Sequence, residues 1–180
     1  MIVMFSVDLE PNKDGSLNDV RGAVTWFDRT VPEGTVFTTH RIATALPELV
    51  DKLRENHEIG VHVHPKEFGH DHDQLAELSR DRQAKLISTT REAIADAVDC
   101  DPDQIQSFRA GRHSASEETI DVLRNLGFEV DASVHVRYDD YLPESITRRN
   151  DPFEWGGLVE VPTSFTRLPI LSRCGPRGVV

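Results

Sequence analysis

The chain has 180 residues, 38% of them hydrophobic, and a formal net charge of -11. At this length one domain can bury a sizeable apolar core, and we expect a single domain over residues 1–180. No apolar run reaches the roughly 18 residues that a membrane span needs, and the acidic balance argues against nucleic acid as a partner, because its binding requires clustered lysines and arginines. The first residues lack a basic segment before an apolar run, so the sequence predicts a cytoplasmic protein.

The cysteines and the scattered acids narrow the possibilities further. Cys100 and Cys174 are too few for a disulfide framework or a four-thiolate zinc site, and we expect two reduced thiols. The acidic residues are spread along the chain rather than gathered in one tail. A strongly hydrated acidic surface is favoured where salt screens its internal repulsion, so the composition indicates a halophilic source.

Short apolar runs alternate with helical patterns from the N-terminus onward. Expected buried strands cover residues 2–7, 35–39, 59–63, 107–110, 128–134 and 158–165. Expected helices cover 43–55 and 81–98, and a third begins after the N-cap Ser116, runs through Leu126 and ends at Gly127. Residues 11–34 and 137–157 are expected to be long loops. This alternation predicts an α/β fold, either an incomplete barrel of parallel strands or an open wound sheet.

Two polar dyads follow two of these runs. Asp8 and Glu10 come at the end of the first expected strand, and His62 and His64 at the end of the third. Side chains two residues apart in a strand share a face, so each dyad can aim both groups at one point. Two carboxylates and two imidazoles that converge would make a site for a divalent metal ion.

Other polar side chains also fall at expected strand ends. His40 follows the second strand, Arg109, Arg112 and His113 the fourth, and His135 the fifth. In parallel α/β folds the active site forms at these carboxyl ends, so the set indicates a site there. The tract from His70 to Asp73 is interpreted as solvated loop rather than as a second metal site.

Imidazole and carboxylate ligands suit zinc best, and cobalt, iron or manganese less selectively. Three protein ligands leave a position for water, whose pKa a metal lowers toward neutrality. A nearby carboxylate can then take the proton of the attacking water. The pattern therefore predicts a hydrolase of amides or esters.

Five segments, taken in order, resemble the polysaccharide deacetylase (NodB-homology) family. They are FSVDLE at 5–10, HEIGVHVHP at 57–65, SFRAGR at 107–112, TIDVLRNLGFEVDASV at 119–134 and LVEVPTSF at 158–165. The resemblance implies a distorted (β/α) barrel of parallel strands and a deacetylase-like catalytic domain. It also implies deacetylation of N- or O-acetylated sugars and a zinc-like metal held by one acid and two histidines.

Carried onto this chain, the resemblance implies specific roles. Asp8 matches the catalytic base, Glu10 the metal-binding acid and His62 the first metal histidine. The family's second metal histidine comes four residues after the first, where this chain has Lys66, so His64 is expected to replace it. The chain thus carries a D-x-E first motif and an H-x-H second motif.

The resemblance also covers the groups around the base. Arg109 resembles the arginine that holds the catalytic base by an ion pair. The family's last strand carries a histidine that protonates the leaving amine, whereas no histidine follows His135 in this sequence. We expect His40 or His113 to supply the acid, and we expect the chain to be a fragment that lacks the last strands of the barrel.

Two other functions stay open beside the metal-dependent deacetylase. One is a metal-independent hydrolase of cyclic or linear amides on the same fold, in which His62 and His64 bind the substrate directly. The other is a glycan-binding or partner-binding module without catalysis. The expected partner is an acetylated glycan or a small amide, with no nucleic acid and no membrane, and oligomerisation that completes the barrel is also left open.

Overall fold

The protein is described by a computed structural model over residues 4–135, 138 and 140–163. Within these residues one sheet has the strand order β1-β2-β3-β4-β5-β7-β6. Neighbouring strands are parallel except for the antiparallel pair β6 and β7. The strands are β1 (Ser6–Leu9), β2 (Thr35–Thr38), β3 (Glu58–Val63), β4 (Ser107–Ala110), β5 (Val130–Asp131), β6 (Phe153–Trp155) and β7 (Leu158–Glu160).

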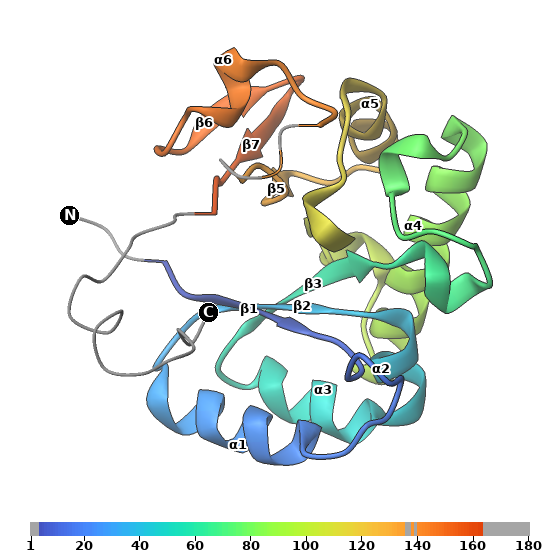
Figure 1. The fold of residues 1–180 in the computed structure, drawn as a ribbon. Coiled ribbons are helices and arrows are strands. Elements are labelled where there is room, and N and C mark those ends of the chain that lie inside the picture. The colour runs from blue at the N-terminus through green and yellow to red at the C-terminus, as the bar shows by residue number, and fades with distance from the viewer. Residues whose placement is uncertain (1–3, 136–137, 139, 164–180) are drawn as a thin grey trace, which may run out of the picture.

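The helices pack in succession along the sheet. Helix α1 contacts α3, α3 contacts α4, and α4 contacts α5, so they form a continuous layer (Figure 1). The α-helices are α1 (Val20–Thr30), α2 (His40–Ala45), α3 (Pro47–Arg54), α4 (Arg80–Ala97), α5 (Glu117–Asn125) and α6 (Glu144–Thr147). Short 3₁₀ helices are η1 (Pro65–Phe68), η2 (Leu75–Glu77), η3 (Pro102–Gln104) and η4 (Gly111–His113).

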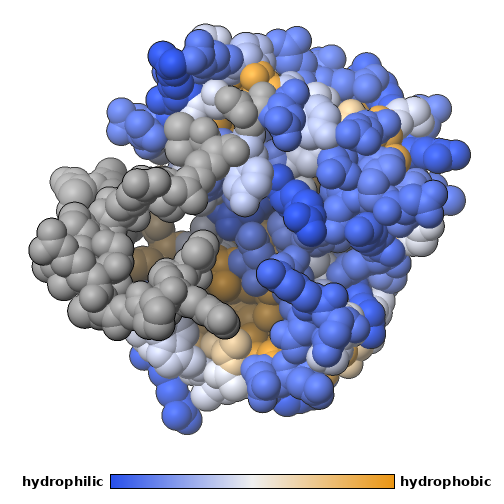
Figure 2. All heavy atoms as spheres, viewed as in Figure 1, coloured by the Kyte–Doolittle hydropathy of each residue, from blue (hydrophilic) through white to orange (hydrophobic). Residues whose placement is uncertain are grey.

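The expected α/β class is confirmed, as a distorted (β/α) barrel whose sheet is not closed within the described residues. Strand β1 pairs with β2 on one side, and the order ends at β6 on the other. Five of the six residues of β3 are buried, as a parallel strand covered on both faces requires. Figure 2 shows mostly hydrophilic residues on the viewed face, broken by a hollow where hydrophobic residues are visible. None of the described helices is long and apolar enough to cross a membrane.

Several expected element boundaries were wrong. The helix expected over 43–55 is two helices, because Pro47 disfavours helical backbone at Leu46 and the chain breaks there. The expected loop over 11–34 contains α1, whose buried Val20, Val24 and Phe27 recur at helical spacing. The expected loop over 137–157 contains α6 and β6.

Other boundaries agree or shift by a few residues. Strands β2, β3 and β4 and helix α4 lie where they were expected, and Ser116 caps α5 by accepting a hydrogen bond from the Thr119 N–H. The strand expected over 128–134 is shortened to β5, and β1 begins later than expected. Residues 2 and 3 of the first expected strand and 164 and 165 of the last lie outside the described residues.

A buried pair of acids joins the last parallel strands. Asp131 on β5 and Glu160 on β7 are register partners, and both are fully buried. The Ser133 hydroxyl donates to Asp131 Oδ1 at 2.5 Å, and the Val134 N–H donates to Glu160 Oε1 at 3.0 Å. Asp131 Oδ2 and Glu160 Oε2 have no hydrogen-bond partner among the described residues, and each carboxyl group is close enough to the other to affect its pKa. Two neighbouring buried carboxyl groups are not both ionised without a large cost, so we expect one of them to hold a proton.

The buried pair of Asp131 and Glu160 is expected to make the stability of the protein depend on pH. Burial and the neighbouring Asp131 carboxyl raise the pKa of Glu160 from 4.5 to about 11. Because the folded-state pKa exceeds that of the unfolded chain, the stabilisation is fully present below about pH 4.5 and declines as the pH rises toward 11. We therefore expect this group to make the free energy of unfolding fall as the pH rises through the neutral range.

Urea unfolding of Glu160→Gln across the neutral range checks this expectation. The glutamine amide can donate to Asp131 while its oxygen accepts from the Val134 N–H, so the variant should fold and lose stability less steeply with pH. Glu154→Gln, at an exposed position of β6, is the control and should keep the wild-type slope. Parallel slopes for Glu160→Gln and the wild type would show that this proton is not held.

Candidate metal centre

The two dyads converge at the carboxyl ends of β1 and β3. The Nε2 atoms of His62 and His64 are 3.1 Å apart. Glu10 Oε2 lies 2.6 Å from His64 Nε2 and 3.7 Å from His62 Nε2. Within the described part of the chain, these three residues form a group that could hold a metal ion, with one ligand atom from each and all of them within 4.8 Å of one another.

The outer ring nitrogens of both histidines are bound to the protein. His62 Nδ1 lies 2.8 Å from the Arg109 carbonyl oxygen, so this nitrogen carries the hydrogen and Nε2 is left with a lone pair. His64 Nδ1 lies 3.1 Å from Asp73 Oδ2 and donates to that carboxylate. Metal-binding histidines are typically oriented by such outer partners. The residues present therefore fit a zinc-like ion, with Nε2 of both rings and Glu10 Oε2 as ligands.

The charges of the cluster are mutually stabilised. The neighbouring imidazoles of His62 and His64 hold the pKa of the Glu10 carboxyl far below its usual 4.5. Burial lowers the pKa of His64, but the carboxylates of Glu10 and Asp73 outweigh it and raise that pKa above 6.5. A cation bound at this point would take the place of the His64 Nε2 proton.

Gly111 allows the backbone to approach His64 closely. A Cβ atom at Gly111 would lie 2.6 Å from the Val63 carbonyl oxygen and 2.8 Å from two ring atoms of His64. The next residues, Arg112 and His113, both have left-handed backbone, with φ of 53° and 54°. Strained backbone of this kind persists where the surrounding structure enforces it, commonly at functional sites.

Arg109 fixes the orientation of Asp8. Its guanidinium donates to Asp8 Oδ1 at 2.7 Å, to the Ser6 hydroxyl at 2.7 Å and to the Ala132 carbonyl at 3.1 Å, and it stacks over the Phe37 ring. The other carboxylate oxygen, Asp8 Oδ2, lies 4.0 Å from His62 Nε2. Asp8 therefore turns one oxygen to the arginine and the other to the histidine cluster.

His113 lies at the same end of the sheet. Its Nδ1 donates to the Ser133 carbonyl at 3.1 Å, and its ring stacks on Tyr138 and contacts His135. Burial, the His135 ring and the Arg109 charge lower the pKa of His113 to about 4. The ring is therefore neutral at neutral pH, with Nε2 as its proton-accepting atom.

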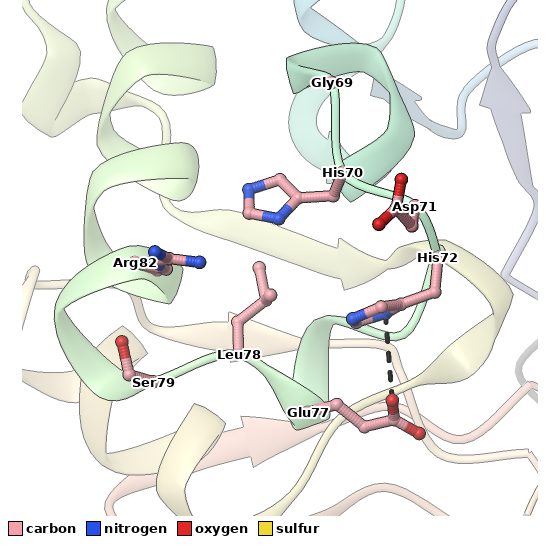
Figure 3. Close-up of a pocket in the computed structure, with 8 residues that line it drawn as sticks. All are labelled: Gly69, His70, Asp71, His72, Glu77, Leu78, Ser79 and Arg82. Carbon is pink, nitrogen blue, oxygen red and sulfur yellow. Dashed lines mark ion pairs between the residues drawn. The ribbon is translucent and has the colours of Figure 1, made fainter.

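Other expected residues lie away from this cluster. His40 packs against the Phe68 ring, and it is not among the residues that line the cleft at the cluster. Arg112 lies at the cleft, where its Nε is 3.6 Å from Asp73 Oδ2. His70 and His72 line a separate pocket beside the start of α4, shown in Figure 3. There His72 pairs with Glu77 at 3.8 Å, and the pocket holds no converging metal-ligand group among the described residues.

Sequence reasoning missed Asp73 and Gly111. Asp73 lies nine residues after His64 in a tract that was interpreted as solvated loop, and its only signal was a carboxylate near two histidines. Its Oδ1 accepts the Lys66 backbone N–H, which turns Oδ2 to His64. Gly111 lies inside the SFRAGR segment, but the close approach that requires glycine depends on the neighbouring strand.

The cluster opens into a cleft of about 810 Å³. The cleft is bordered by the loop after β1, the start of α2, the segment after β3 and the segment after β4. Asp8, Glu10, His62, His64 and His113 all contribute to its wall. It therefore has room for a sugar-sized group beside the candidate metal ligands.

The fold and this site define an α/β protein of the NodB-homology type, with carboxylates and imidazoles gathered at the carboxyl ends of its parallel strands. The family model for polysaccharide deacetylase matches residues 14–130, which is more than half of the chain. The chain belongs to the polysaccharide deacetylase family. A comparison with curated proteins found no match.

Solved structures of this family share the fold. A proposed polysaccharide deacetylase from Mycobacterium smegmatis matches with a TM-score of 0.64 and 21% identity, over 90% of this chain and 58% of that one. A family 4 carbohydrate esterase from Streptomyces lividans, in complex with acetate, matches with a TM-score of 0.56 and 18% identity. The match covers 72% of this chain and 60% of that one. A family 4 pseudoenzyme from Bacillus anthracis matches with a TM-score of 0.54 and 14% identity, and the match covers 71% of this chain and 41% of that one. This chain thus spans three fifths or less of the length of each.

Proposed function

We propose that this protein is a metal-dependent hydrolase that removes the acetyl group from an N- or O-acetylated sugar or a related amide. The supporting observation is the convergence of Glu10, His62 and His64, with both histidines oriented through Nδ1. Family membership supports the reaction class. In this proposal residues 1–180 act as one deacetylase-like catalytic domain, and Lys66 is not a ligand.

The metal would be held by Glu10 Oε2 and by Nε2 of His62 and His64. Zinc is the proposed ion, since imidazole and carboxylate ligands with one open position suit it best. When bound, such an ion polarises the acetyl carbonyl and lowers the pKa of water. The chain contributes the three ligands and the outer partners that keep them aligned.

Asp8 is the proposed general base. Its Oδ2 faces the histidine cluster and accepts the proton of the attacking water, while Oδ1 stays bonded to Arg109. The guanidinium has three further contacts, so Asp8 is held in one orientation through the reaction. A base positioned in this way contributes about 10²–10⁴-fold to the rate.

His113 is the proposed proton donor to the leaving group. The resting ring is neutral, so Nε2 must first take up the proton that Asp8 accepts from water. The lowered pKa of about 4 then makes the protonated ring a strong donor to the leaving group. The His113 ring interacts electrostatically with both Asp8 and Arg109, and it lines the cleft. His40, which packs against Phe68, is the less suitable of the two histidines.

Acetate release from an N-acetylglucosamine oligomer tests this proposal. We expect turnover by the purified protein, loss of turnover after chelation, and recovery when zinc is added back. Turnover that survives exhaustive chelation would support a metal-independent amide hydrolase. Saturable binding of the oligomer without acetate release, also in the zinc-loaded protein, would contradict hydrolysis and support a glycan-binding module.

A further inference from the structure

We propose that the substrate of this cleft carries an anionic group, a carboxylate or a phosphate, near its acetyl group. This inference rests on the proposed function and names the substrate class of the same site. It is carried by the contrast between cations and carboxylates around the cleft. The basic side chains at the rim of the cleft have no acidic partner or a weak one. Each carboxylate of the cleft, in contrast, has an ion pair or a hydrogen bond with another group of the protein.

Four basic residues line the cleft of a chain that has 31 acidic and 20 basic residues. They are Lys13, Arg41, Lys66 and Arg112, and all but Arg112 are outside every ion pair found in the described residues. Arg112 has one weak contact, at 3.6 Å from Asp73, and its side chain is 64% exposed. An acidic protein that keeps three unpaired cations and one weakly paired cation around one cleft can attract an anion to it.

The four carboxylates of the cleft have partners in the protein. Asp8 is paired with Arg109, and Glu10 with His64. Glu67 accepts the backbone N–H of Arg41, and Asp73 accepts the backbone N–H of Lys66 and pairs with His64. Three of these carboxylates are therefore paired with basic side chains, and one oxygen of Glu67 is held by a backbone N–H, which makes them less available to a substrate.

The cations are placed on three different segments around the cluster. Lys13 lies in the loop after β1. The Asn12 side chain stabilises this loop by donating hydrogen bonds to the Ser16 hydroxyl and the Asn18 carbonyl. Arg41 lies in the first turn of α2, and its guanidinium is beside Gly15 of the same loop. Lys66 lies in η1, directly after the strand that carries the histidines. An anionic group that enters with the acetyl group would meet cations from more than one side.

Three probes with the same N-acetylated ring separate charge from shape. Methyl N-acetylglucosaminide is neutral, N-acetylglucosaminuronic acid carries a carboxylate at C6, and N-acetylglucosamine 6-phosphate carries a phosphate there. We expect kcat/KM for acetate release to be about tenfold higher for at least one anionic probe, and the preference to shrink as salt rises. The two anionic probes show which anion the cleft prefers.

Variants connect the preference to the named residues. Lys66→Gln and Arg41→Gln should each lower the ratio of anionic to neutral kcat/KM, and the double variant should lower it further. Lys85→Gln, at an exposed lysine of α4 away from the cleft, is the control and should keep the wild-type ratio. A ratio near one in the wild-type protein, or a ratio that neither variant changes, overturns the proposal.

The proposal stays testable if no probe is hydrolysed. Failure to hydrolyse these single-ring probes bears on turnover and not on the charge preference, so binding of the same three probes is then measured by calorimetry. Tighter binding of an anionic probe, weakened in Lys66→Gln, supports the proposal. Equal affinities for the neutral and anionic probes overturn it.

Discussion

Asp8→Asn is expected to lower kcat for acetate release by about 10²–10⁴-fold while the protein keeps its zinc. Asparagine preserves the shape of the side chain and can still accept the hydrogen bond from Arg109, but it cannot take a proton from water. Asp8 is not one of the three proposed ligands, so metal content should not change. Acetate release and zinc content, measured on the same preparation, check both halves of this prediction.

Folding must be controlled in this experiment because Arg109 is buried and carries the charge that Asp8 balances. An unpaired buried charge destabilises the fold, so unfolding of Asp8→Asn is recorded beside its activity. Asp51→Asn, at an exposed position of α3, is the matched control and should behave as the wild type. Full activity in Asp8→Asn would rule out its role as the base.

Gly111→Ala is expected to weaken zinc binding by at least about tenfold, which corresponds to about 1.4 kcal/mol. The added methyl carbon would lie 2.6 Å from the Val63 carbonyl oxygen, which β3 holds in place, and 2.8 Å from the His64 ring. His64 would have to move away from Glu10 and Asp73. Zinc affinity, measured by competition with a chelating dye, reads out this displacement.

Gly22→Ala provides the comparison for that variant. Gly22 lies in α1, and a Cβ atom there would meet nothing within 4 Å. Because alanine is favoured over glycine in a helix, this substitution should leave zinc affinity unchanged and add about 0.5–1 kcal/mol of stability. If Gly111→Ala also binds zinc with wild-type affinity, His64 is not a ligand or is not held as the structure indicates.

The sequence predicted the features that depend on local periodicity. Strand β3 follows from a run of mostly apolar residues, and the shared direction of His62 in β3 and His64 just after it follows from alternation along extended backbone. The meeting of these histidines with Glu10 was also predictable, because the carboxyl ends of all parallel strands in one sheet lie at the same edge, here on β1 and β3 with β2 between them. The D-x-E and H-x-H spacing therefore led to the residues that the structure brings together.

The features that depend on packing between distant segments were not predictable. The orientation of His64 by Asp73 requires the turn after η1, and the need for glycine at position 111 arises from β3 beside it. Helix α1 was missed, and residues 11–34 were expected to be a loop, although Val20, Val24 and Phe27 have helical spacing. The juxtaposition of Asp131 and Glu160 depends on the register of β5 and β7, which neither strand shows alone.

The most direct test of the metal centre is zinc-edge anomalous diffraction from crystals of the zinc-loaded protein. We predict one strong peak, bonded to Glu10 and to Nε2 of His62 and His64, with Asp8 beside it and bonded to Arg109. A peak at His70 and His72 alone, or no peak at the three proposed ligands in a protein that has taken up zinc, would contradict the account.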